Sequence, residues 1–197
     1  MNTDAEIVER SRYGPTAFGE LYDRHGPDIY RYAARRAGDF VAEDVMAETF
    51  LIAFEGRFDF VGPAGAVRPW LFGIATNLLR RHHRAEARVL RALVKLGGRV
   101  EEPDLLGAVD DRLDAPGNQA RIGRALEDLP AIDRDAILLL VWAGLSYEDI
   151  ATATEVPIGT VRSRINRARR KLRANLNVTL SEKEDDHGRP AAAPRHA

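Results

Sequence analysis

Residues 144–173 read GLSYEDIATATEVPIGTVRSRINRARRKLR, and this stretch decides the fold class. Ser146 and Asp149 have the spacing of a capping box, so a short helix is expected directly after Ser146. A turn at 154–156 follows, and Pro157 suits the start of a second helix. A short helix, a tight turn and a basic helix form the helix-turn-helix plan, in which the second helix enters the major groove of DNA.

The second helix combines a narrow apolar stripe with a basic arc. The stripe recurs at helical spacing and predicts the packed face: Val161, Ile165, Ala168 and Leu172. Seven Lys and Arg residues lie between 160 and 173, without an acidic residue. Because arginine can chelate a phosphate or a guanine edge, we predict DNA contacts here: Thr160, Arg162, Ser163, Arg164, Asn166, Arg167 and Arg170. The alternative is a solvated basic face.

Outward from this stretch, the whole chain has helical character. Strand signals are nearly absent, and apolar residues recur at spacings of three and four. Clusters of glycine, proline and acidic residues interrupt this pattern once, as in a linker. We therefore predict an all-α fold of two small helical domains joined by a flexible linker. The predicted parts are a first domain at 1–92, the linker at 93–118, a second domain at 119–176 and a disordered polar tail at 177–197.

The composition excludes several classes of protein. The chain has 197 residues, 29 Lys and Arg, 30 Asp and Glu, and a formal net charge of −1. A general nucleic-acid coat needs a strong positive excess, so that class is excluded. The absence of cysteine excludes disulfides and thiolate sites and agrees with a cytoplasmic location. The longest apolar run is far shorter than the roughly 18 residues needed to span a bilayer, so we expect no membrane segment.

No constellation of catalytic or metal-ligating residues is visible. The pair His82 and His83 with Glu86 lacks the spacing of a helical zinc motif. Phosphate-binding loops, dinucleotide fingerprints and nucleophile elbows are also missing. The sequence therefore predicts no enzyme, no catalytic residue, no metal site and no cofactor.

A predicted helix over 41–55 carries an acidic stripe that contains a leucine. At 100° per residue one face is expected to be core: Val41, Val45, Thr49 and Ile52. A second face holds the acidic stripe: Asp44, Glu48, Leu51 and Glu55. Such a stripe suits a basic protein partner. The pattern alone favours the alternative, an ordinary solvated face.

Two neighbouring segments have the character of a nucleic-acid surface. The glycine-rich stretch 56–67 contains Phe58 and Phe60, which either stack on unpaired bases or pack onto the core. A helix from Pro69 to about Leu90 is expected to bury Leu71, Ile74, Leu78 and Ala85. Another sector of this helix combines an indole, an amide and guanidinium groups: Trp70, Asn77, Arg81, Arg84 and Arg88. The alternative places Trp70 partly in the core.

Five blocks, in this order and separation, resemble the extracytoplasmic-function (ECF) group of the sigma-70 family. They are EDVMAETF at 43–50, RPWLFGIATN at 68–77, LP at 129–130, GLSYEDIA at 144–151 and GTVRSR at 159–164. The resemblance implies an alternative sigma factor, which binds core RNA polymerase, reads the −35 and −10 promoter elements and helps to open the DNA. The alternative is a helix-turn-helix regulator that binds DNA alone.

The resemblance also assigns roles to the residues singled out above. The acidic stripe would grip the β′ clamp helices of the polymerase, with the β flap as a second polymerase contact. Phe58, Phe60, Trp70, Asn77, Arg81 and Arg84 would contact the −10 region, and the basic helix would read the −35 element. An anti-sigma protein is a further partner of such factors. Three residues depart from the family pattern: Ala47 for Gln, Thr154 for Leu and Glu155 for Gly.

Overall fold

The computed structural model describes residues 2–95, here called the N-terminal half, and 116–176, the C-terminal half. Within these ranges it contains helices and no strand, which confirms the predicted all-α class. The N-terminal half contains α1 (Asp4–Tyr13), η1 (Pro15–Phe18), α2 (Gly19–Glu55), η2 (Gly56–Phe58), η3 (Ala64–Ala66) and α3 (Val67–Lys95). The C-terminal half contains α4 (Pro116–Glu127), α5 (Ala131–Val141), α6 (Tyr147–Thr154) and α7 (Ile158–Leu176).

The predicted linker and tail fall mostly outside the described residues. The helix α3 continues to Lys95, and α4 begins at Pro116, so helices enter the predicted linker range at both of its ends. The predicted tail at 177–197 lies wholly outside the described part. No described helix has the length and apolar character needed to cross a membrane.

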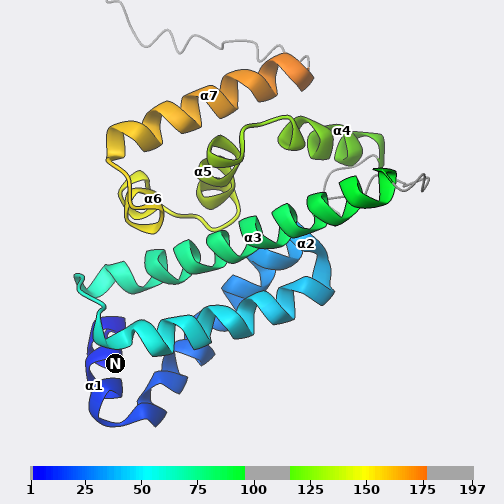
Figure 1. The fold of residues 1–197 in the computed structure, drawn as a ribbon. Coiled ribbons are helices and arrows are strands. Elements are labelled where there is room, and N and C mark those ends of the chain that lie inside the picture. Colours follow the sequence, from blue (N-terminus) through cyan, green and yellow to red (C-terminus); the bar gives the residue numbers. More distant parts are fainter. Residues whose placement is uncertain (1, 96–115, 177–197) are drawn as a thin grey trace, which may run out of the picture.

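The long helices α2 and α3 form the N-terminal core (Figure 1). The helix α2 bends at Gly38, whose φ of 78° and ψ of 164° are not helical and favour glycine. The buried apolar side chains include Leu21, Ile29, Tyr32, Leu71, Phe72 and Leu79. Among the residues expected to face inward on α3, Leu71 and Leu78 are buried and Ile74 is half-buried. The expectation for Ala85 is wrong: it is exposed, because this part of α3 extends beyond α2 (Figure 1).

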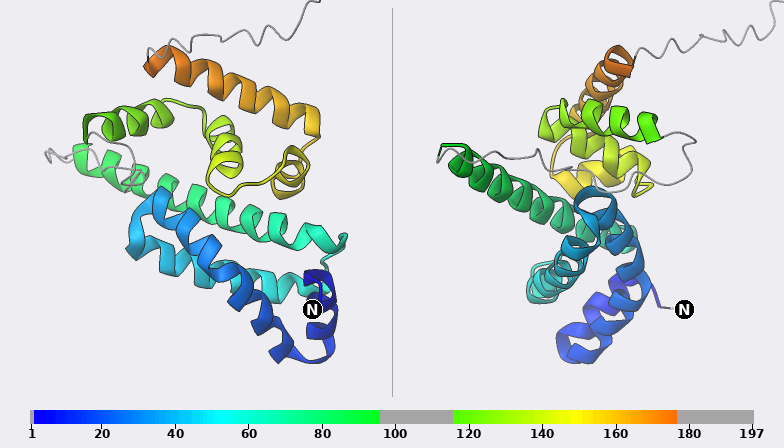
Figure 2. Two further views of the ribbon diagram at one scale, coloured as in Figure 1. Left: turned by 180° about the vertical axis from the view of Figure 1, so that it is seen from behind. Right: turned by 90° about the vertical axis from the view of Figure 1, so that its right-hand side faces the viewer.

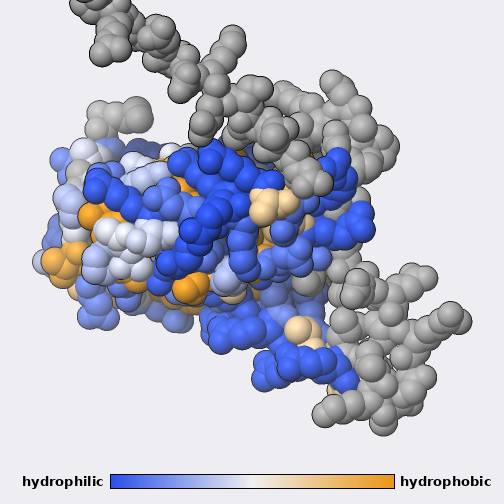
Figure 3. Space-filling view, turned by 90° about the horizontal axis from the view of Figure 1, so that it is seen from above, coloured by the Kyte–Doolittle hydropathy of each residue, from blue (hydrophilic) through white to orange (hydrophobic). Residues whose placement is uncertain are grey.

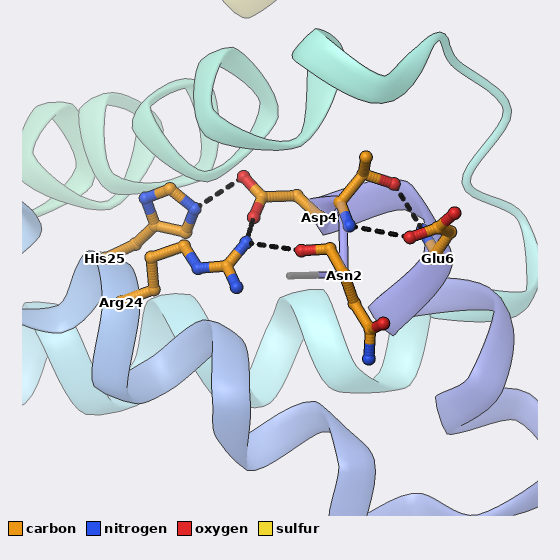
Figure 4. A network of polar contacts seen from close by, with 6 residues as sticks. Asn2, Asp4, Glu6, Arg24 and His25 are labelled. Carbon is orange, nitrogen blue, oxygen red and sulfur yellow. Dashed lines mark hydrogen bonds and ion pairs between the residues drawn. The ribbon is translucent and has the colours of Figure 1, made fainter.

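The N-terminal helix α1 was not predicted from the sequence, although a capping box begins it. The Thr3 hydroxyl accepts a hydrogen bond from the Glu6 amide, and the Glu6 carboxylate accepts one from the Thr3 amide. Figure 4 shows how α1 is fixed to α2: Asp4 forms an ion pair with Arg24 and a hydrogen bond with His25, whose Nε2 lies 2.7 Å from Asp4 Oδ2. Because His25 is buried, this contact anchors α1 against the N-terminal core.

The C-terminal half contains the predicted helix-turn-helix, formed by α6 and α7. Ser146 and Asp149 make both hydrogen bonds of the capping box, each 3.1 Å long, as predicted. Glu155 has φ 53° and ψ 42°, so it keeps the left-handed conformation that glycine adopts with less strain. The Thr154 hydroxyl donates to the Ile150 carbonyl at 2.7 Å, which satisfies a polar group where apolar leucine was expected.

The apolar stripe of α7 packs inward as predicted. Val161, Ile165 and Ala168 are fully buried, and Leu172 is partly buried against the core. The helix contacts α4, α5 and α6. Its opposite face therefore points away from the C-terminal core.

The two halves pack against each other along α3, which contacts both α5 and α6 (Figure 2). Arg36 of α2 reaches Asp135 of α5, with 2.6 Å between Nη2 and Oδ1, and these side chains are only 2% and 1% exposed. Arg80 of α3 binds the other oxygen of Asp135. Arg36 also donates to the Tyr32 hydroxyl at 2.8 Å. These contacts form a buried cluster of charges between the halves.

A second region of contact brings backbone atoms of the halves together. The Arg68 guanidinium donates to the Ala143 carbonyl at 2.6 Å. A Cβ atom added to Gly73 would lie closer than 3.0 Å to the Ala153 carbonyl oxygen at the end of α6. Glycine is therefore required at position 73 for this approach of α6 to α3.

Candidate nucleic-acid and polymerase interfaces

The outer face of α7 presents most of the residues predicted to contact the −35 element. Arg162, Ser163, Asn166 and Arg170 are exposed, while Thr160 and Arg164 are half-buried. Figure 3 looks onto the α7 side of the molecule, and its described surface is mainly hydrophilic. No other described helix lies across this face of α7 (Figure 1).

Arg167 is exposed on α7, but its guanidinium is paired with a buried carboxylate. Its Nε and Nη2 donate to the two carboxylate oxygens of Asp133, at 3.0 and 2.8 Å. Asp133 lies in the first turn of α5 and is buried. The hydrogen bonds and negative charge of Asp133 raise the pKa of Arg167. The forked pair fixes α7 to α5, a geometry that suits the planar guanidinium and not lysine.

The two phenylalanines of the glycine-rich stretch are placed differently. Phe60 packs on Trp70, with ring centroids 4.7 Å apart and an interplanar angle of 36°. Phe58 is 55% exposed, and the Arg57 guanidinium lies 4.3 Å from its ring centroid. Phe60 and part of Trp70 therefore pack against each other, whereas the ring of Phe58 is exposed to solvent.

The helix α1 holds this stretch in place. Arg12 donates to the carbonyls of Arg57, at 3.2 Å, and Phe60, at 2.9 Å. Arg57 donates in return to the Ser11 carbonyl at 3.2 Å and is buried. Sequence reasoning missed these anchors, because the contacts join residues about 45 positions apart.

The arginines predicted on α3 lie together on one face. Arg81, Arg84 and Arg88 line one groove with Arg91, and Asn77 is exposed on the same helix. This arrangement offers several guanidinium groups to a phosphate backbone.

The acidic stripe of α2 is exposed along its whole length. Asp44, Glu48 and Glu55 are exposed, Leu51 is 56% exposed, and Ala47 is exposed beside them. Val45 and Thr49 of the same helix are buried, as predicted for the core face. Glu48 Oε1 lies 3.4 Å from Arg81 Nη2, so the acidic stripe of α2 borders the arginine face of α3.

His83 lies near the buried charges between the halves. Burial and the positive charges of Arg36 and Arg134 lower its pKa from 6.5 to about 4. Its Nδ1 is 3.6 Å from Glu86 Oε2, too far for a hydrogen bond. Within 2–95 and 116–176, no group of three or more His, Asp or Glu residues is placed to hold a metal ion.

Two protein-family profiles match the chain. Sigma-70 region 2 matches residues 21–89, and Sigma-70 region 4 matches residues 119–172. The first match contains the acidic stripe and the arginine face of α3. The second contains the helix-turn-helix.

Curated proteins and solved structures agree with these profiles. The ECF RNA polymerase sigma factor SigE of Mycolicibacterium smegmatis is 34% identical over 84% of this chain, which covers 64% of that protein's length. The RNA polymerase sigma-H factor of Pseudomonas aeruginosa is 32% identical, over 91% of this chain and 96% of that protein. The sigma factor RpoE of Bartonella quintana, solved in complex with the anti-sigma factor NepR, aligns with a TM-score of 0.61 and 27% identity, over 82% of this chain and 98% of that one.

The lowered pKa of His83 predicts a loss of stability in acid. The unfolded chain binds this proton near pH 6.5 and the folded chain only near pH 4, so the unfolded state gains protons first as the pH falls. Between pH 6.5 and 4, this group should lower the free energy of unfolding by about 2 kcal/mol, after allowance for its partial exposure. Urea titrations at several pH values measure this change.

The substitution His83→Gln should remove this part of the pH dependence. The matched variant His82→Gln, one residue away on the same helix, should keep it. Equal pH profiles for wild type and His83→Gln would contradict the assigned burial of the neutral ring.

Proposed function

The chain belongs to the ECF group of the sigma-70 family, and we propose from this that it is an alternative sigma factor. It binds core RNA polymerase, directs it to promoters through the −35 and −10 elements and assists in opening the DNA. One structural observation carries the proposal: the exposed acidic stripe of α2 lies directly beside the arginine face of α3, joined by Glu48 and Arg81. A polymerase contact and a DNA contact can therefore be made side by side.

The acidic stripe is the proposed polymerase contact. Asp44, Glu48 and Glu55 supply negative charge for a basic partner, and Leu51 supplies an exposed apolar anchor among them. We assign this surface to the β′ clamp helices and assign the C-terminal half to the β flap. A regulator that binds DNA alone would leave this stripe without a role.

The −10 contact is proposed to centre on Phe58. Its exposed ring suits stacking with an unpaired base, and Arg57 behind it is held by Ser11 and the Phe54 carbonyl. Phe60 and Trp70 form the packed support of this site. Asn77, Arg81 and Arg84 continue the surface along α3 toward the backbone of the same DNA.

The −35 contact is proposed on the outer face of α7. Its exposed side chains would enter the major groove, with half-buried Thr160 and Arg164 at the margin: Arg162, Ser163, Asn166 and Arg170. Arg167, a further predicted DNA contact, is exposed on α7 and paired with Asp133, and we propose that it orients α7 on α5 beside the DNA.

The −35 and −10 elements cannot be contacted at the same time while the halves remain packed together. Positions −35 and −10 are separated by 25 base pairs, or about 85 Å at 3.4 Å per base pair. The helix α3, with 29 residues, is only about 44 Å long, and α6 packs directly on it. Residues 96–115 can span about 70 Å when fully extended. We therefore propose that the halves separate on the polymerase and that the cluster of Arg36, Arg80 and Asp135 is broken.

The remaining assignments follow from the same proposal. The two binding units are residues 1–92 and 119–176, joined by 93–118 and followed by the tail at 177–197. The chain works in the cytoplasm with the polymerase and performs no chemistry itself. An anti-sigma protein is a proposed partner, by analogy with the complex of RpoE and NepR.

Reversing one charge in the acidic stripe should weaken polymerase binding. We expect Asp44→Lys to lower the affinity for core RNA polymerase at least tenfold and to abolish run-off transcription from promoter-bearing genomic fragments. The control Asp23→Lys makes the same charge change at an exposed position of α2 outside the stripe. If both variants bind and transcribe as the wild type does, the polymerase assignment is wrong.

Arg162 and Arg167 should differ in what they affect. The substitution Arg162→Ala should weaken binding to −35 DNA and leave thermal stability unchanged, because its side chain is exposed on the outer face. The substitution Arg167→Ala should lower the melting temperature, because it leaves the buried Asp133 carboxylate without its partner. Gel shifts and thermal melts measure the two effects, and a reversed pattern would contradict the assignment.

A further inference from the structure

A cavity of about 470 Å³ lies between the two halves. The N-terminal half contributes α2 and α3, and the C-terminal half contributes α4 and α5. Its charged lining consists of Arg36, Arg80, His83, Arg84, Arg91, Glu127, Arg134 and Asp135. Five guanidinium groups therefore face two carboxylates.

The two carboxylates do not neutralise this cavity. Asp135 shares its two oxygens between Arg36 and Arg80. Within 2–95 and 116–176, the side chains of Arg84, Arg91 and Arg134 form no ion pair. The pKa of Arg134 is lowered first by burial and then by the charge of Arg36, while Asp135 and Glu127 raise it.

Three buried nitrogen atoms in the lining have no hydrogen-bond partner among the residues that the structure describes. They are the Nε atoms of Arg36 and Arg134 and the Nδ1 atom of His83. Arg36 is only 2% exposed, so its unpaired Nε–H is costly unless an acceptor is supplied. An anion in the cavity would supply acceptors to groups from both halves.

The size and chemistry of the cavity select the class of ligand. Its volume lies within the roughly 300–1,000 Å³ of small-molecule sites. Guanidinium groups bind phosphate through paired hydrogen bonds. Ala87, Ala131 and Ile132 add an apolar part of the wall, against which a ring or chain can pack.

We propose that this cavity binds a small molecule carrying two or more phosphate groups. The ligand would contact Arg84 and Arg91 of the N-terminal half and Arg134 of the C-terminal half. Because it bridges the halves, it stabilises their packed arrangement and not the separated one. The ligand would thus reduce promoter opening. Only this last consequence rests on the proposed function; the binding site does not.

The test is calorimetric titration of the free, full-length chain at fixed ionic strength. The probes are inorganic pyrophosphate and ATP, with a polyglutamate peptide as a competing acidic macromolecule. We expect saturable binding of a phosphate probe, with at least tenfold weaker binding to Arg134→Gln. The matched control Arg31→Gln loses the same charge at an exposed position outside the cavity and should bind as the wild type does.

The imidazole of His83 provides a second readout that needs no variant. A phosphate probe should raise the pKa of His83 from about 4, because the anion offsets the charges of Arg36 and Arg134; Glu86 and His82 are the other titratable groups near the ring. The NMR resonances of His25, which does not line the cavity, serve as an internal chemical-shift reference. If Arg134→Gln does not fold, this measurement on the wild type decides.

Each outcome has a definite meaning. Tighter binding of ATP than of pyrophosphate identifies a nucleotide site, and equal or tighter binding of pyrophosphate identifies a polyphosphate site. Both results support the proposal. Equal weakening by Arg31→Gln, an unchanged pKa of His83 or binding of the peptide alone overturns it.

Discussion

The packed arrangement of this protein depends on the buried carboxylate of Asp135. Arg36 and Arg80 approach it from the N-terminal half, and the pair with Arg36 is almost completely removed from water. A buried ion pair adds little net stability, because the desolvation of the two charges offsets their attraction. The ion pair instead restricts the geometry, because a shift of α5 along α2 and α3 would leave a buried charge unpaired. The cluster therefore fixes one relative placement of the halves.

The same physics makes this placement reversible. When the halves separate completely, Arg36 and Asp135 both regain water, so the lost attraction is largely replaced by hydration. The surfaces assigned to polymerase and DNA are exposed before separation: Leu51 on α2, Phe58 after it and Arg162 on α7. Binding can thus begin on the packed form, and the distance between promoter elements then favours the separated one. An anion between the halves would act in the opposite direction.

Local signals made much of the fold predictable. The capping box at Ser146, the apolar stripe of α7 and the buried face of α2 all arise from residues within a few positions of each other, and the structure contains them. Contacts between distant residues were not predictable in this way. Arg36 and Asp135 are 99 positions apart, and Arg167 and Asp133 are 34 apart. The packing of Phe60 on Trp70 likewise depends on the path of the chain through η3 into α3. The helix α1 was predictable from local sequence, because Thr3 and Glu6 have the spacing of a capping box.

The distance between the halves tests most directly whether they pack together in the free chain and separate on the polymerase. The chain contains no cysteine, so Arg31→Cys and Val141→Cys introduce two exposed spin-label sites, one in each half. Pulsed electron spin resonance on the free chain should give one narrow distance distribution, which Asp135→Asn broadens. On core RNA polymerase with promoter DNA, the distance should increase by tens of ångströms, as the roughly 85 Å between the elements requires. The same short distance in both states, or a broad distribution in the free wild-type chain, would contradict the account.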